Sequence, residues 1–131
     1  MTRDELIKYY NNFLKFERLT NQDVVVGAGG AMLMLGLRTS TEDIDTGVPE
    51  SIFHRIVIKH KLPTKVIPSN QHVVAKYDAV IDIHKRFGEP TCIVDGVCIW
   101  TPQFILAFKQ KMNRPKDQED IQKLKAYLNI K

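Results

Sequence analysis

The segment "GAGGAMLMLGLRTSTEDID", residues 27–45, decides how this sequence is interpreted. It begins with three glycines within four positions, continues as an apolar stretch, and ends on two aspartates separated by one residue. Glycines that open a helix let an anionic ligand approach backbone N–H groups, where the helix dipole favours negative charge. Side chains at i and i+2 of a strand point to the same side, so Asp43 and Asp45 would point together.

Length and composition indicate one globular domain. The chain has 131 residues, of which 44% are hydrophobic and 26% charged, and this suits a single domain over residues 1–131 with its own core. No apolar run approaches the roughly 20 residues that span a bilayer. The N-terminal "MTRDELIKYY" has no long apolar run of the kind found in signal peptides. We therefore expect a cytoplasmic protein with no membrane partner.

The positive charge is concentrated at the C-terminal end. The formal net charge is +4, and residues 107–131 hold seven basic side chains against three acidic ones. Such a segment steers phosphates or nucleic acid toward a site. The alternative is an ordinary solvated helix face.

Hydrophobic periodicity and turn residues predict an α/β domain with a mixed, partly antiparallel sheet flanked by helices. We expect helices over 3–17, about 30–37, 49–61, 102–112 and 115–128. We expect strands over 23–27, 41–48 and 64–68, one or two strands within 72–87, and a hairpin over 91–100.

The hairpin also bears on the two cysteines. If Asp95 and Gly96 form a two-residue turn, Ile93 pairs with Cys98 while Cys92 pairs with Ile99. The two thiols then point to opposite faces, so we expect no disulfide, which agrees with a reducing compartment.

A Rossmann dinucleotide site is one interpretation of the glycine-rich segment. Asp45 lies 18 residues after Gly27, near the spacing of a ribose-binding acid. Against this interpretation, Met32 stands where the third glycine is needed. The antiparallel hairpin also disagrees with a doubly wound parallel sheet.

A metal-carboxylate site accounts for more of the segment. Two neighbouring carboxylates repel each other unless a cation or bases neutralise them. Mg²⁺ is usually held by one or two carboxylates together with substrate phosphates, and Mn²⁺ accepts similar ligands. The glycine turn would then accept the phosphates. The plain alternative is a surface strand with two solvated acids.

The stretch "GGAMLMLGLRTSTEDID" resembles the signature of the polymerase-beta-like nucleotidyltransferase superfamily, in which a glycine pair and a helix precede a D-x-D strand. It is especially similar to the branch of small domains that contains the AbiEii-type toxins. Asp82 in "AVIDIH" matches the later acid of that branch. Its K…R-x-x-D-x-x-D element is matched by Lys109, Arg114, Asp117 and Asp120. Ordered matches cover about residues 24–124.

The resemblance implies transfer of a nucleoside monophosphate from a Mg-NTP to a hydroxyl on RNA, protein or a small molecule. Asp43, Asp45 and Asp82 would hold one or two Mg²⁺ (or Mn²⁺) ions, and Asp82 would double as the base. Gly29, Gly30, Arg38 and Lys109 are the expected nucleotide contacts, and Thr41 and Asp117 are further candidates.

Two departures from the family pattern leave a second function open. Ala31 stands where many members have serine, and the extra helical domain of larger members is missing. The alternative is therefore a catalytically silent binding or regulatory module, antitoxin-like or inhibitor-like. Either form of so small a domain would suit a homodimer or a partner protein.

Some site residues can also be argued from periodicity. Asp117 shares a helical stripe with Ile121 and Leu124, so it should face inward. Lys109 lies on an inward stripe of the preceding helix. These two residues line the site or form a structural ion pair, and both interpretations stay open.

Two residues near Asp82 share its expected face. Asp78 has the same parity as Asp82 and is the other candidate for the third acid. His84 is interpreted as an ordinary, partly buried histidine or as a substrate contact.

Overall fold

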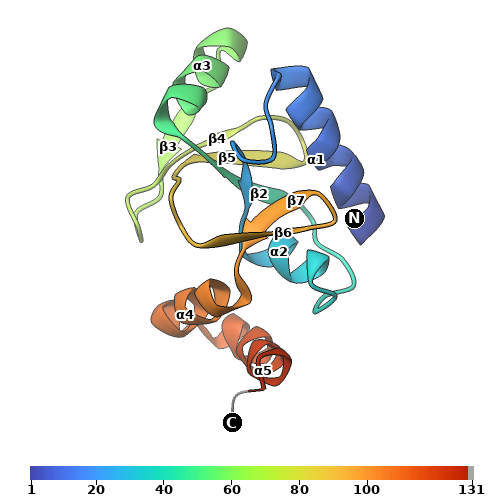
Figure 1. Ribbon diagram of the computed structural model, residues 1–131. Coiled ribbons are helices and arrows are strands. Elements are labelled where there is room, and N and C mark those ends of the chain that lie inside the picture. The colour runs from blue at the N-terminus through green and yellow to red at the C-terminus, as the bar shows by residue number, and fades with distance from the viewer. Residues whose placement is uncertain (130–131) are drawn as a thin grey trace.

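The computed structural model describes residues 1–129 as a seven-stranded sheet with helices packed around it (Figure 1). This confirms the expected α/β class. The helices are α1 (Arg3–Glu17), α2 (Ala28–Met34), α3 (Glu50–His60), α4 (Pro102–Met112) and α5 (Gln118–Tyr127). The strands are β1 (Val25–Val26), β2 (Ile44–Val48), β3 (Thr64–Val66), β4 (Val73–Lys76), β5 (Ile81–Lys85), β6 (Thr91–Val94) and β7 (Val97–Trp100).

The sheet is mixed, with the strand order β3-β4-β5-β2-β1-β7-β6. The pairs β2–β5 and β1–β7 are parallel, and the other neighbours are antiparallel. Because β1 and β2 are antiparallel although α2 connects them, they do not form the parallel βαβ unit of a dinucleotide fold. The topology thus excludes the Rossmann interpretation.

The N-terminal ends of two helices are fixed by capping residues in the sequence. Thr2 and Glu5 form a capping box at α1, in which Thr2 Oγ1 accepts from the Glu5 N–H and the Glu5 carboxylate accepts from the Thr2 N–H. Thr101 caps α4 by accepting from the Phe104 N–H, and Pro102 occupies the first turn. These caps explain why both helices start where the sequence predicts.

Other elements differ from expectation in their bounds. The strand expected over 41–48 begins only at Ile44, the first residue paired with β5, so Asp43 lies in the preceding loop. The helix expected over 115–128 is divided into a 3₁₀ turn over Pro115–Asp117 and α5. The hairpin has the expected register, and Cys92 and Cys98 are free thiols.

The two faces of the sheet differ in character. One face packs against α2, where a Cβ placed on Gly30 would lie 2.6 Å from Val26 Cγ1. The other face presents Asp45 and Asp82. In Figure 1, α4 and α5 form a pair at the C-terminal end of the molecule, apart from α1 and α3. Within residues 1–129, we find no helix of the length and apolarity needed to cross a membrane.

Candidate functional site

Asp45 and Asp82 lie directly opposite each other on the parallel strands β2 and β5. Residues in register on neighbouring strands project to the same face, so the two carboxylates share one surface. The Asp45 side chain is 50% exposed and the Asp82 side chain 22% exposed. Both are therefore open to a ligand that approaches this face.

Asp43 joins the same acidic group from the loop before β2. Burial, and then the negative charges of Asp45 and Asp82, raise the pKa of the Asp43 carboxyl above its usual value. A like charge has this effect only when it is near. Asp45 and Asp82 are adjacent in the sheet, and Asp43 is near enough for their charges to act on it; we call these three residues the acid cluster.

Two basic side chains flank the acid cluster. His84 Nε2 lies 3.3 Å from Asp45 Oδ1, and this contact is the main reason why the pKa of Asp45 is lowered. Lys76 Nζ lies 3.3 Å from Asp82 Oδ1. Sequence reasoning missed Lys76, because its position opposite Asp82 depends on the antiparallel register of β4 and β5.

The acid cluster is not a closed metal cage. Among residues 1–129, no group of three or more histidine, cysteine, aspartate or glutamate side chains is assembled as a ready set of metal ligands. Its donor set consists of carboxylate oxygens, which suit a hard cation such as Mg²⁺. Mg²⁺ commonly takes its remaining oxygens from water and a substrate phosphate, so these residues fit a cation that arrives with its ligand.

A polar hollow of about 460 Å³ adjoins the acid cluster and is lined partly by Arg38, Thr41 and Asp43. A Cβ placed on Gly29 would lie 3.0 Å from Arg38 Nη1 and 3.4 Å from Thr41 Oγ1. The absence of a side chain at Gly29 therefore leaves room beside the guanidinium group. Thr41 also fixes the loop, because its hydroxyl donates to the Asp43 carbonyl at 3.2 Å.

Gly30 lies on the other side of α2. A Cβ placed there would be 2.6 Å from Val26 Cγ1 and 3.2 Å from Leu6 Cδ1, both of which belong to the core. Gly30 therefore allows close packing of α2 on β1. Of the glycine pair, only Gly29 faces residues that line the polar hollow, namely Arg38 and Thr41.

Lys109 and Asp117 form the structural ion pair that the sequence left as one of two alternatives. Lys109 is only 3% exposed, and its Nζ lies 3.3 Å from Asp117 Oδ1 and 3.2 Å from Asp120 Oδ2. Arg114 Nε completes the neutralisation of Asp117 at 2.7 Å. Burial alone would raise the pKa of Asp117, but its bonds with Arg114 and Lys109 hold that pKa below its usual value.

Arg38 connects this buried network to the polar hollow. Its Nη2 lies 2.5 Å from Asp120 Oδ2, while Nη1 lies on the side of Gly29. Lys109 and Arg38 therefore both contact Asp120, which links the two side chains. We call Lys109, Arg114, Asp117 and Asp120 the buried network.

Asp78, the other candidate for the third acid, has a different role. It lies in the turn between β4 and β5, where its Oδ1 accepts from the backbone N–H groups of Val80 and Ile81. Hydrogen bonds of this kind stabilise the turn. Its carboxylate is therefore committed to the local backbone.

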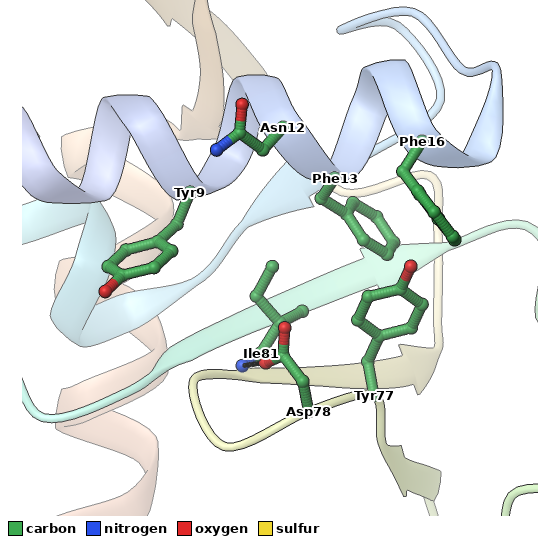
Figure 2. Close-up of a pocket in the computed structure, with 7 residues that line it drawn as sticks. All are labelled: Tyr9, Asn12, Phe13, Phe16, Tyr77, Asp78 and Ile81. Carbon is green, nitrogen blue, oxygen red and sulfur yellow. Dashed lines mark hydrogen bonds between the residues drawn. The ribbon is translucent and has the colours of Figure 1, made fainter.

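A further hollow, of about 320 Å³, lies between α1 and the turn before β5 and is lined mainly by aromatic rings (Figure 2). Tyr77 points toward α1 and meets Phe13 edge-on, with 4.7 Å between ring centroids. The Tyr77 hydroxyl donates to the buried carboxylate of Glu17 at 2.6 Å, and His60 Nε2 lies 3.0 Å from the same carboxylate. These contacts join α1, α3 and the turn, at a place that includes no member of the acid cluster.

We compared the chain with protein-family models, curated proteins and solved structures, and none of them matches it. The role of the acid cluster has therefore to be inferred from its own geometry and chemistry.

Proposed function

We propose that this protein is a metal-dependent nucleotidyltransferase that moves a nucleoside monophosphate from an NTP to an acceptor hydroxyl. The observation that carries the proposal is the parallel register of β2 and β5, which sets Asp45 opposite Asp82. Asp43 adds a third carboxylate whose pKa is raised by burial and by the charges of the other two. Like-charged groups held together at a surface indicate that a cation is part of the working state.

The acid cluster supplies the ligands for that cation. Asp43, Asp45 and Asp82 would hold Mg²⁺ or Mn²⁺. When bound, it would offset charge on the phosphates and lower the pKa of the attacking hydroxyl. Lys76 and His84 hold Asp82 and Asp45 in place.

The proposed reaction balances as a phosphoryl transfer. The acceptor oxygen forms a bond to the α-phosphorus, the bond between that phosphorus and the bridging oxygen of the β-phosphate breaks, and pyrophosphate leaves. The hydroxyl proton passes to a carboxylate of the acid cluster, for which we propose Asp82. A carboxylate in hydrogen-bond reach is a suitable acceptor for this proton.

The polar hollow is the proposed site of the β- and γ-phosphates. Gly29 leaves space there, and Arg38 and Thr41 offer a cation and a hydroxyl. Lys109 is a positioning residue, since it reaches Arg38 only through Asp120. It would set the orientation of the guanidinium group without touching the nucleotide.

Calorimetry with each NTP, in Mg²⁺ and in EDTA, tests the proposal. We expect binding that requires Mg²⁺, because the cation joins two sets of negative charges that otherwise repel. Asp45→Ala should abolish the Mg²⁺-dependent binding, while Asp4→Ala, which removes an exposed acid on α1, serves as the matched control. Absence of Mg²⁺-dependent NTP binding in the wild type would overturn the proposal.

A silent binding or regulatory module is the second candidate, and Ala31 is the observation that favours it. Ala31 is fully buried, and it provides no hydroxyl where many members of the resembled family have one. Incubation with α-³²P-labelled NTPs and a lysate separates the two candidates. Label transferred to RNA or protein supports the enzyme, whereas Mg-NTP binding without transfer supports the module.

A further inference from the structure

A hollow of about 710 Å³ lies at the opposite end of β5 from Asp82. It is formed by the loop before β4, the segment after β5 and one side of α4. His72, Arg86, Phe87, Phe104, Phe108 and Lys111 are among its lining residues. It therefore combines aromatic rings with basic side chains, and we call it the aromatic-basic pocket.

Arg86 has three neighbours in this pocket. Its guanidinium carbon lies 4.2 Å from the centre of the Trp100 ring, and Nη1 lies 3.3 Å from His72 Nδ1. Glu89 Oε1 lies 2.7 Å from Arg86 Nε, so the pocket's carboxylate is already neutralised. Lys111 is exposed at the rim. The remaining charge that a ligand would meet is positive.

The aromatic-basic pocket and the polar hollow lie on either side of the acid cluster. The polar hollow includes Asp43. In the other direction along β5, His84 contacts Asp45 and Arg86 follows two residues later. A Cβ placed on Gly27 would lie 3.6 Å from Arg86 Nη2, and the Gly27 N–H donates to the Asp45 carbonyl. Arg86, which lines the pocket, is thus near enough to Asp45 for its charge to contribute to the lowered pKa of that carboxyl.

This arrangement indicates that the polar hollow and the aromatic-basic pocket bind different groups of the reaction. In phosphoryl transfer, the attacking and leaving oxygens lie roughly in line through the phosphorus. If pyrophosphate leaves from the polar hollow, the attacking hydroxyl has to come from the side of the aromatic-basic pocket. This step rests on the proposed function.

We propose that the aromatic-basic pocket binds the terminal nucleotide of a single-stranded RNA, which is the acceptor. Unstacked bases of single-stranded RNA stack on aromatic side chains, here those of Phe87 and α4, while basic groups meet the phosphate. The positive excess of the chain lies in residues 107–131, which include the lining residues Phe108 and Lys111. An extended polyanion such as RNA can contact more of these basic side chains than a single free nucleotide can.

Fluorescence anisotropy with a short labelled single-stranded RNA, without NTP, tests this proposal. We use Phe87→Ala and Lys111→Ala, because Phe87 is 48% exposed and Lys111 is exposed, so neither change should unfold the protein. Phe87→Ala should weaken RNA binding at least about fivefold. Lys111→Ala should reduce the slope of log K against log salt by about 0.7, the value for one phosphate contact on a single strand.

Phe16→Ala and Lys15→Ala on α1 are the matched controls. Phe16 is 64% exposed and Lys15 is also exposed, so the same residue types are removed elsewhere. Both controls should bind RNA within about twofold of the wild type. RNA binding that is absent in the wild type, or equal in the pocket variants and the controls, overturns the proposal.

Parallel titrations with Mg-NTP separate this proposal from the proposed function. If the pocket variants lose Mg-NTP affinity and keep RNA affinity, the pocket takes the incoming nucleotide and the acceptor proposal is overturned. If the wild type binds no Mg-NTP but the pocket variants still lose RNA affinity, the nucleotidyltransferase proposal fails and the RNA site stands.

Discussion

The acid cluster and the buried network both contain aspartates, but they differ in solvent exposure and in how far their charges are neutralised. In the buried network, Asp117 and Asp120 are nearly inaccessible, and each contacts two basic side chains. In the acid cluster, Asp45 is half exposed, and Asp43 stands near two other carboxylates. The aspartates of the buried network are thus neutralised within the fold, whereas the acid cluster is more exposed and is the place where we propose that a cation binds.

The pKa directions show the same contrast. Ion pairs with Arg38 and Lys109 hold the pKa of Asp120 below its usual value, although burial opposes them. The pKa of Asp43 is raised, because burial and neighbouring carboxylates both disfavour its charge. The charge of Asp120 therefore favours the folded state, whereas the charge of Asp43 opposes it. Within the acid cluster this applies to Asp43 and not to Asp45, whose pKa is lowered by His84.

The largest expected effect is that of Lys109→Met. The substitution leaves Asp117 and Asp120 buried with fewer cations, and breaking a buried ion pair in this way costs about 3–5 kcal/mol. Urea unfolding at neutral pH measures the loss. Lys111→Met, an exposed position on the same helix, should change stability by no more than about 0.5 kcal/mol. Equal losses in the two variants would contradict a structural role for the network.

The next largest effect on stability distinguishes Gly30 from Gly29. Gly30→Ala places a Cβ 2.6 Å from Val26 Cγ1 in the core, and overpacking of this kind costs about 1–3 kcal/mol. Gly29→Ala meets the end of the flexible Arg38 side chain instead, so its stability should stay near that of the wild type. Mg-NTP affinity, measured by calorimetry, should fall in Gly29→Ala. A stable Gly30→Ala variant would show that α2 can move away from β1.

A smaller effect is expected when the acid cluster loses charge. Asp43→Asn removes one of three repelling carboxylates, so thermal stability without metal should stay within about 0.5 kcal/mol of the wild type or rise. Asp45→Asn should instead lower stability slightly, because the contact with His84 lowers the pKa of Asp45 and its charge therefore favours the folded state. A large drop in melting temperature would mean that these carboxylates are structural acceptors, like those of the buried network.

The smallest expected effect is the pH dependence of the stability difference between Asp43→Asn and the wild type. Because the folded-state pKa of Asp43 is raised, protonation favours the folded state, and the destabilisation by its charge disappears as pH falls through that pKa. Any stability advantage of Asp43→Asn at pH 7 should therefore shrink toward about pH 4, near the ordinary pKa of aspartate. Urea unfolding across this range measures it, and an advantage that grows at low pH would contradict the assignment.

The same pH series should show the opposite sign for the buried network. The folded-state pKa values of Asp117 and Asp120 are lowered from 3.8. Their stabilisation is thus complete above that value and is lost as pH falls through the lower, folded-state pKa values.

Much of the fold could be predicted because its signals are local. The bounds of α1 and α4 follow from periodicity, from Thr2 and Thr101 as caps, and from Pro102. The start of β2 could not be placed, since pairing with β5 decides that Ile44 is its first residue. Element type is therefore a local property here, while strand ends depend on partners far along the chain.

For the site, the sequence predicted the acids better than their surroundings. The D-x-D spacing and the family resemblance pointed to Asp43, Asp45 and Asp82, of which Asp45 and Asp82 are paired in the sheet; their role as one site stays a prediction. The side chains that flank them, Lys76 and Arg86, are positioned by sheet register and by stacking on Trp100. No short motif encodes those two relations, so the sequence alone did not reveal them.

The short strand β1 has a consequence for how the chain folds. It has only two residues, yet it joins β2 to β7, and Val26 pairs with Ile99 from the far end of the sequence. Such a contact closes a long loop, which slows folding compared with a chain of local contacts. During synthesis, the strands β1 to β5 can pair before β7 has emerged, so the sheet is completed from two parts, the β1–β5 part and the β6–β7 hairpin. Trp100 ends β7 and is buried in the folded protein, so the fluorescence of this single tryptophan reports the moment when the two parts join.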